Sequence, residues 1–183
     1  MEERKNLNLE PLDGNADNIG QWLSAIQDTR RRTTEFLSSI EPDWIDFVPD
    51  DKEESIGTIL YHLAAIEASW LYTEVLETSF PLEIDALFPY DVRDDNGKLT
   101  SVNDTMQSHL NRLKIVREML LDGFSKMSPK EFVTKKEFEE YDVSPVYVLH
   151  HLMQHEAEHR SQINAIGMKA KAVLGNKTPK ENE

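Results

Sequence analysis

Apolar residues recur every three or four positions along four long stretches of this chain, and this periodicity limits the fold more than any other feature. Side chains with that spacing share one face of an α-helix, so each stretch is expected to form a helix with one apolar face. Helices of this kind bury their apolar faces against one another, and the sequence therefore predicts an all-α fold. The expected helices span about residues 17–39, 55–78, 101–126 and 144–174, and the last is expected to fray over residues 167–174.

Residues at the expected helix starts support these boundaries. Ser55 is a suitable N-cap for the second helix. Ser101, with Asp104 three residues later, resembles a capping box for the third helix. Ser144 is the expected cap of the fourth helix and precedes Pro145, and proline is favoured at the first position of a helix.

The connections between the helices predict their directions. About 22 residues, from about 79 to 100, separate the second and third helices, and they are too polar and too rich in proline for another long helix. Fully extended, they could reach roughly 70 Å, whereas a helix of about 22 residues is about 33 Å long. We therefore expect an up-down-down-up four-helix bundle, in which this long crossover lets the second and third helices run parallel. One extra helical turn is expected near Ser128 and Pro129.

The chain is long enough for one hydrophobic core. Of its 183 residues, 39% are hydrophobic, which favours a single domain over two. We expect an N-terminal extension over residues 1–16, the bundle over 17–174 and a disordered tail over 175–183. The opening residues lack the apolar stretch of a signal peptide, and no run of eighteen apolar residues occurs. A cytoplasmic protein without a membrane anchor is therefore expected.

The composition also argues against several classes of function. Thirty-four acidic residues outweigh twenty basic ones, and the formal net charge of -14 would repel phosphate backbones and anionic lipid. Neither nucleic acid nor a membrane is therefore expected as a partner. The chain has no cysteine, which removes disulfides, thiolate ligands and a cysteine nucleophile. If the protein carries out thiol chemistry, the thiol must be a substrate.

The stretch VLHHLMQHEAEHRSQI, near the end of the chain, holds four of the six histidines. On a helical wheel, His159 and His155 point within roughly 40° and 80° of the apolar side of the expected helix. His150 and His151 lie beyond about 110°, and we interpret them as solvated. The i, i+4 spacing of His155 and His159 would let both imidazoles bind one metal ion, and a hydrogen-bonded role in the core is the alternative.

A metal site needs a third ligand, and His62 on the second helix is the natural donor. It lies about seven residues after the start of that helix, a depth that matches His159 if the second and fourth helices are antiparallel. His109 on the third helix lies at a similar depth, where it could either fill the core or act in the site. The sequence therefore predicts a metal site of His62, His155 and His159, with His109 as a candidate catalytic residue.

Several other polar residues fall on faces that are otherwise apolar. Because buried charges are normally paired, we expect Arg160 to form an internal ion pair with Glu67 or Glu156. The alternative role for these residues is to support the imidazoles. Arg30 and Thr33 on the first helix reach the same depth and are candidates for binding the carboxylates of a thiol cofactor, although a solvated edge of arginines would also explain Arg30.

The segments SIGTILYHLAAIEASWL and HLMQHEAEHRSQI together resemble the DinB-like superfamily of four-helix metalloproteins, over about residues 17–170. That superfamily includes thiol-dependent S-transferases of the bacillithiol and mycothiol type. The resemblance implies an up-down-down-up bundle, in agreement with the long crossover. It also implies that His62, His155 and His159 correspond to the metal triad of the family.

Three neutral imidazoles suit a divalent ion such as zinc or nickel and leave at least one position open, as catalytic sites do. A small thiol held there as thiolate would attack an electrophilic small molecule, which is the S-transfer that the resemblance implies. Water in the same position would give hydrolysis, and a non-catalytic metal- or ligand-binding protein is the third alternative. The resemblance, with Phe80, Phe88 and Tyr90 of the crossover, also leads us to expect a homodimer.

Overall fold

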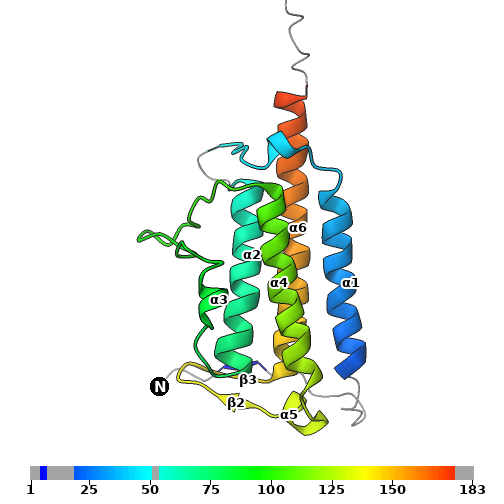
Figure 1. Cartoon of the computed structure of the whole chain (residues 1–183), viewed down its shortest axis with the longest axis vertical. Helices are drawn as coiled ribbons and strands as arrows, with labels where there is room; N and C mark the ends of the chain where they lie inside the picture. The colour runs from blue at the N-terminus through cyan, green and yellow to red at the C-terminus, as the bar shows by residue number, and fades with distance from the viewer. Residues whose placement is uncertain (1–4, 8–18, 51–53, 176–183) are drawn as a thin grey trace, which may run out of the picture.

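The structure, a computed structural model, describes residues 5–7, 19–50 and 54–175, and this part of the chain is mostly helical. The expectation of an all-α fold is confirmed in outline. Most of the predicted N-terminal extension (1–16) and of the predicted tail (175–183) lies outside the described residues. The four long helices are α1 (Ile19–Leu37), α2 (Ile56–Trp70), α4 (Met106–Ser125) and α6 (Pro145–Leu174) (Figure 1).

Local hydrogen bonds explain where the helices begin and end. Ser55 caps α2 as the sequence predicts, because its hydroxyl accepts the backbone N–H three residues later. α4 begins later than expected, since Thr105 rather than Ser101 is its cap. α2 ends earlier than expected: its α-helical hydrogen bonding stops at Trp70, and the chain continues as a π-helical turn, η3 (Leu71–Val75). α6 remains helical to its last residue rather than fraying.

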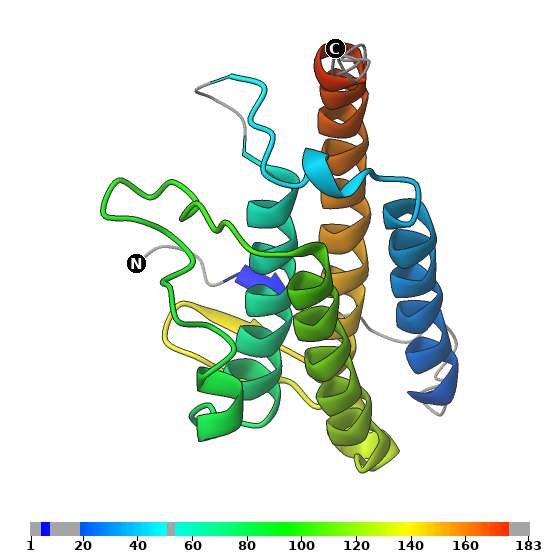
Figure 2. The ribbon, with the colours of Figure 1, turned by 45° about the horizontal axis from the view of Figure 1, so that its top comes forward.

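α1 and α6 run in one direction, and α2 and α4 run in the opposite direction, as the colour gradient in Figure 1 and the turned view in Figure 2 show. α1 and α2 each pack against both α4 and α6. The connection between α2 and α4 contains a short helix, α3 (Leu82–Asp85), and an isolated β-bridge between Arg93 and Leu99. Tyr61 on α2 holds this connection, because its hydroxyl donates to the Tyr90 carbonyl at 2.6 Å.

A small three-stranded sheet with the order β1-β3-β2 lies at one end of the bundle and was not expected from the sequence (Figure 1). β1 (Lys5–Leu7) pairs in parallel with β3 (Tyr141–Val143), and β2 (Lys136–Glu137) pairs with β3 in the antiparallel direction. Strands of two or three residues are too short to show the alternating pattern that identifies a strand in a sequence.

Two short helices occupy the remaining links. η2 (Pro42–Trp44) lies between α1 and α2, and α5 (Pro129–Val133) lies between α4 and β2. α5 is the extra helical turn expected from the sequence. Ser128 and Glu131 form its capping box, in which each side chain binds the backbone N–H of the other residue.

A buried cluster of four charged side chains connects all four long helices. Arg30 on α1 and Arg117 on α4 both contact Glu67 on α2 and Glu156 on α6, at nitrogen–oxygen distances of 2.7 to 3.2 Å. Burial alone would raise the pKa of Glu67, but the charges of Arg117 and Arg30 outweigh it and hold this pKa below its usual range. Glu67 is therefore ionised at neutral pH, and the cluster joins the helices by paired charges.

The same two arginines also bind the backbone of the opposite helix. Arg30 on α1 donates to the Leu113 carbonyl of α4 at 2.6 Å. Arg117 on α4 donates to the Ile26 carbonyl of α1, also at 2.6 Å. Sliding one helix past the other would break both contacts, so this reciprocal pair fixes the register of α1 against α4.

The prediction that Arg160 pairs with Glu67 or Glu156 is wrong. Its guanidinium donates instead to the Thr29 carbonyl at 3.3 Å and to the Thr33 hydroxyl at 3.2 Å. Both glutamates are indeed buried and paired, but with arginines from α1 and α4. The periodicity of one helix gives the direction of a side chain, and it does not say which neighbouring helix supplies the partner.

Replacement of Arg117 by methionine should lower the free energy of unfolding by about 3 to 5 kcal/mol, because it leaves buried carboxylates without a main partner. Chemical denaturation followed by circular dichroism measures this change. The matched control is Arg31→Met, since Arg31 pairs with Asp28 and Glu35 on the exposed side of α1. The control should unfold like the parent protein. If Arg117→Met also unfolds like the parent, the cluster does not hold the helices together.

Candidate metal centre

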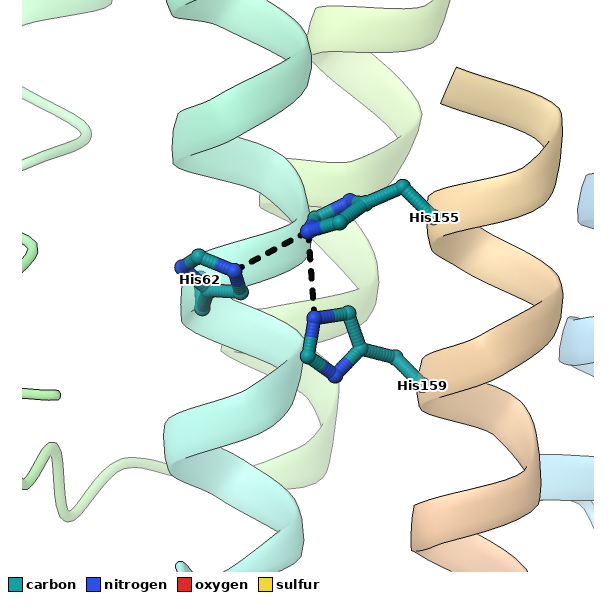
Figure 3. Close-up of side chains that lie close together, drawn as sticks. All are labelled: His62, His155 and His159. Atoms are coloured by element: carbon teal, nitrogen blue, oxygen red, sulfur yellow. Dashed lines mark hydrogen bonds between the residues drawn. The ribbon is translucent and has the colours of Figure 1, made fainter. Parts of the chain in front are cut away.

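Three histidines meet in the space between α2 and α6. Figure 3 shows His62 on α2 and His155 and His159 on α6 pointing toward one another. The Nε2 atom of His155 lies 3.0 Å from Nε2 of His62 and 3.1 Å from Nε2 of His159. His62 is buried and the other two are half-buried, so the group lies at the edge of the core. The three residues that the sequence predicts as metal ligands are therefore brought together.

The arrangement of nitrogen atoms fits a bound cation. A ring nitrogen carries either one hydrogen or one lone pair, so Nε2 of His155 cannot form good hydrogen bonds to both neighbouring Nε2 atoms at once. Lone pairs that face one another are unfavourable unless a positive ion lies between them. Tetrahedral zinc, with Zn–N bonds of about 2.0–2.1 Å, would hold its nitrogen ligands roughly 3.3 Å apart. The observed separations of 3.0 and 3.1 Å are close to that value.

Gln162 fixes the orientation of one ligand. Its Oε1 atom lies 2.7 Å from Nδ1 of His159, and an amide oxygen can only accept a hydrogen bond. Nδ1 of His159 therefore carries the hydrogen, which leaves the lone pair of Nε2 facing the other two imidazoles. Gln162 was not expected from the sequence to have a role in the site. Gln162 follows His159 by three residues, and side chains with this spacing are neighbours on a helix surface. This spacing is the sequence signal that could have predicted the contact.

The three imidazoles are neutral near pH 7. Burial, followed by the charges of His159 and Arg93, lowers the pKa of His62 to about 4. Burial is also the largest of the causes that together lower the pKa of His155 to about 3, and the charges of His159, His62 and His151 are the others. The pKa of His159 is lowered by burial as well. Because metal ligands must be deprotonated, these shifts keep the nitrogen lone pairs available to a cation.

The ion cluster helps to orient the two histidines on α6. Glu156 directly follows His155 and points into the cluster, where it is almost fully buried. Neighbouring positions on a helix differ by about 100° in direction, so this contact turns His155 and His159 toward α2. On α2, Glu67 belongs to the same cluster and lies five residues after His62. The contacts that join the helices therefore also align the ligands.

His109 does not join the three histidines, although the sequence suggested it as a catalytic residue at the same depth. Its side chain is fully buried near the start of α2, where a Cβ added at Gly57 would lie 3.1 Å from Nε2 of His109. Gly57 precedes His62 by five residues, or about 7.5 Å along the helix. Nε2 of His109 has no hydrogen-bond partner among the described residues. His109 therefore fills the core beside a glycine, and its catalytic role is left without support.

The candidate cofactor-binding residues Arg30 and Thr33 also lie away from the histidines. The guanidinium of Arg30 is buried in the ion cluster, with all three of its nitrogens engaged. The interpretation of Arg30 as part of a solvated edge is therefore wrong. Thr33 is fully buried, donates to the Thr29 carbonyl and accepts from Arg160. Neither side chain is available to bind a carboxylate of a thiol.

The expectation that His150 and His151 are solvated is wrong in part. Both are half-buried, and Nδ1 of His150 is buried without a hydrogen-bond partner among the described residues. The ring of His151 lies 4.4 Å from that of Trp70, measured between ring centroids, and 5.8 Å from that of His155. His151 therefore packs beside Trp70 and a candidate ligand and keeps only part of its surface accessible.

A cavity of about 1140 Å³ lies elsewhere, between η3, α4 and α5. None of the histidines lines it. Apolar residues such as Tyr72, Ile115 and Met119 line it together with charged residues, and among the charged ones Lys126 pairs with Asp122. Large volume alone does not make a reactive site, and the convergent nitrogens make the histidine group the better candidate.

Comparison with protein families identifies a match over most of the chain. The sequence profile of the DinB superfamily matches residues 25–163, a span that includes all three histidines. A comparison with curated proteins found no match. Among the described residues, no helix is both long and apolar enough to cross a membrane.

The His155→Ala variant should lose most of its bound metal, because only two imidazoles remain. Metal content of the purified protein, measured by elemental mass spectrometry, gives the ratio of metal to chain. His150→Ala, on the same helix but outside the group, is the matched control and should keep the ratio of the parent protein. A full equivalent of metal in His155→Ala would show that the ion binds elsewhere.

Proposed function

We propose that this chain, which belongs to the DinB superfamily, binds one divalent metal ion, zinc or nickel, through His62, His155 and His159. The observation that carries the proposal is that Nε2 of His155 lies 3.0 and 3.1 Å from Nε2 of His62 and of His159, at the edge of the core. Imidazole suits both zinc and nickel, so the donor set favours neither. The described residues supply three ligands, so the site would keep a position open for a substrate.

We propose further that the protein is an S-transferase that joins a small thiol to an electrophile. The ion would supply positive charge that favours thiolate over thiol at neutral pH, where a free thiol of pKa about 8.5 is mostly protonated. The chain has no cysteine, so the thiol is a substrate. In the reaction the thiol loses its proton to solvent, and its sulfur bonds to an electrophilic carbon. The leaving group, such as a halide, departs with its bonding electron pair.

The residues of the chain would orient this reaction rather than take part in proton transfer. Gln162 keeps His159 in the tautomer that presents Nε2, and the buried position of His62 excludes water from one side of the group. Hydrolysis would call for a general base, and the two carboxylates that the sequence suggested near the site, Glu67 and Glu156, are engaged by arginines. This favours S-transfer over hydrolysis.

The fold that we propose is the up-down-down-up four-helix bundle, and the helix directions in Figure 1 support it. A cytoplasmic homodimer remains part of the proposal. Of the aromatic residues offered for its interface, Phe80 and Phe88 pack against the core of the same chain. Tyr90 keeps 55% of its surface exposed and is the better candidate for a contact between subunits.

Metal-loaded protein should accelerate the reaction of bacillithiol with 1-chloro-2,4-dinitrobenzene, and His159→Ala should slow this turnover at least about tenfold. The absorbance of the thioether product measures the rate. His150→Ala, which leaves the proposed ligands intact, should react like the parent protein. Equal rates for the parent and His159→Ala, or a rate independent of the thiol, would reject S-transfer.

A further inference from the structure

We propose that Trp70, His151 and Tyr147 form a stacking platform beside the candidate metal centre, which binds a planar, electron-poor substrate. The proposal rests on the proposed function, because it names the class of electrophile that the thiol would attack. All three residues are half-buried. Trp70 and Tyr147 pack against the core with one part of their surface, and the remaining part is accessible.

The platform shares a helix face with the candidate ligands. Tyr147 and His151 precede His155 by eight and four residues on α6, and such spacings bring side chains to the same face of a helix. Trp70 follows His62 by eight residues, at the last turn of α2. The platform therefore continues the row of ligands toward one end of the space between α2 and α6.

The ring geometry makes this row continuous. The rings of Tyr147 and His151 are nearly parallel, at 6° with centroids 6.3 Å apart. His151 is in turn stacked on His155, at 25° and 5.8 Å. The indole of Trp70 lies 4.4 Å from the ring of His151, tilted by 38°. Trp70 and His151 lie against each other, so a flat molecule would stack on the accessible surface of this pair, near the candidate metal ligand His155.

The chemistry of the rings indicates which substrates would bind. The face of an indole carries negative charge density, and it attracts electron-poor groups more strongly than phenyl rings do. A planar electrophile that reacts with thiolates, such as a quinone or a nitro-substituted arene, has an electron-poor face that matches it. Stacking also favours flat molecules over saturated rings of the same size, because a saturated ring cannot approach the indole face as closely.

A protein in which Trp70 is the only tryptophan tests the platform directly. Trp22→Phe combined with Trp44→Phe leaves Trp70 alone of the three tryptophans. We expect 1,3-dinitrobenzene, which is planar and has no leaving group, to quench the Trp70 emission to saturation. Nitrocyclohexane, which is not planar, should not. The reverse variant, Trp70→Phe, keeps the other two tryptophans and should show no saturable quenching. Equal, unsaturable quenching by both compounds in the Trp70-only protein would overturn the proposal.

Affinity provides a second measurement. By equilibrium dialysis, Trp70→Leu should bind 1,3-dinitrobenzene about fivefold more weakly or worse, the loss expected when an aromatic partner is removed. Trp44→Phe, in η2, is the control and should bind like the parent. Unchanged affinity in a folded Trp70→Leu protein would reject the platform. If circular dichroism shows this variant to be unfolded, the fluorescence titration decides.

Both assays omit the thiol and are run with and without zinc, so they can fail independently of S-transfer. Saturable quenching without thiol-dependent turnover would keep the platform and reject the transferase. Turnover without saturable quenching would keep the transferase and reject the platform.

Discussion

The buried ion cluster of Arg30, Glu67, Arg117 and Glu156 is the interaction on which the rest of the structure depends. One charge comes from each long helix, so no helix can rotate about its axis without separating a buried pair. An apolar core would tolerate small rotations, because hydrophobic contacts have no direction. Buried charges must be paired, and the geometry of an arginine fork is narrow. The cluster therefore fixes the orientation of the four helices relative to one another. We infer that this, rather than added stability, is its main effect.

The histidine group follows from that arrangement. Glu156 faces the cluster, and this contact turns His155 and His159 toward α2. Glu67 fixes α2 in the same way, and His62 then meets the pair from the other side. A three-histidine site needs its nitrogens aligned to a few tenths of an ångström, and side chains on rigid helices achieve this better than loops. On both α2 and α6, the candidate metal ligands lie within one or two helical turns of the glutamate that belongs to the ion cluster.

Much of this could be predicted from the sequence, and the failures have physical causes. Apolar periodicity identified the four helices, and equal depth along antiparallel helices identified His62 as the partner of His155 and His159. His109 satisfied the same depth argument and yet packs beside Gly57, because depth does not determine which gap a side chain enters. Nothing in the sequence distinguishes Arg117, because a lone arginine on an amphipathic helix is usually solvated. Arg117 becomes a buried, paired residue only because the three other long helices supply Glu67, Glu156 and the Ile26 carbonyl as its partners.

A crystal structure of the zinc-loaded protein tests most directly whether the three Nε2 atoms bind one divalent ion. Anomalous scattering locates the ion without reference to its ligands. The geometry of the histidine group predicts one zinc ion at about 2.0–2.1 Å from Nε2 of His62, His155 and His159, with a fourth position open to solvent. Zinc bound at another group of residues, or through only one of the three histidines, would contradict this account of the site.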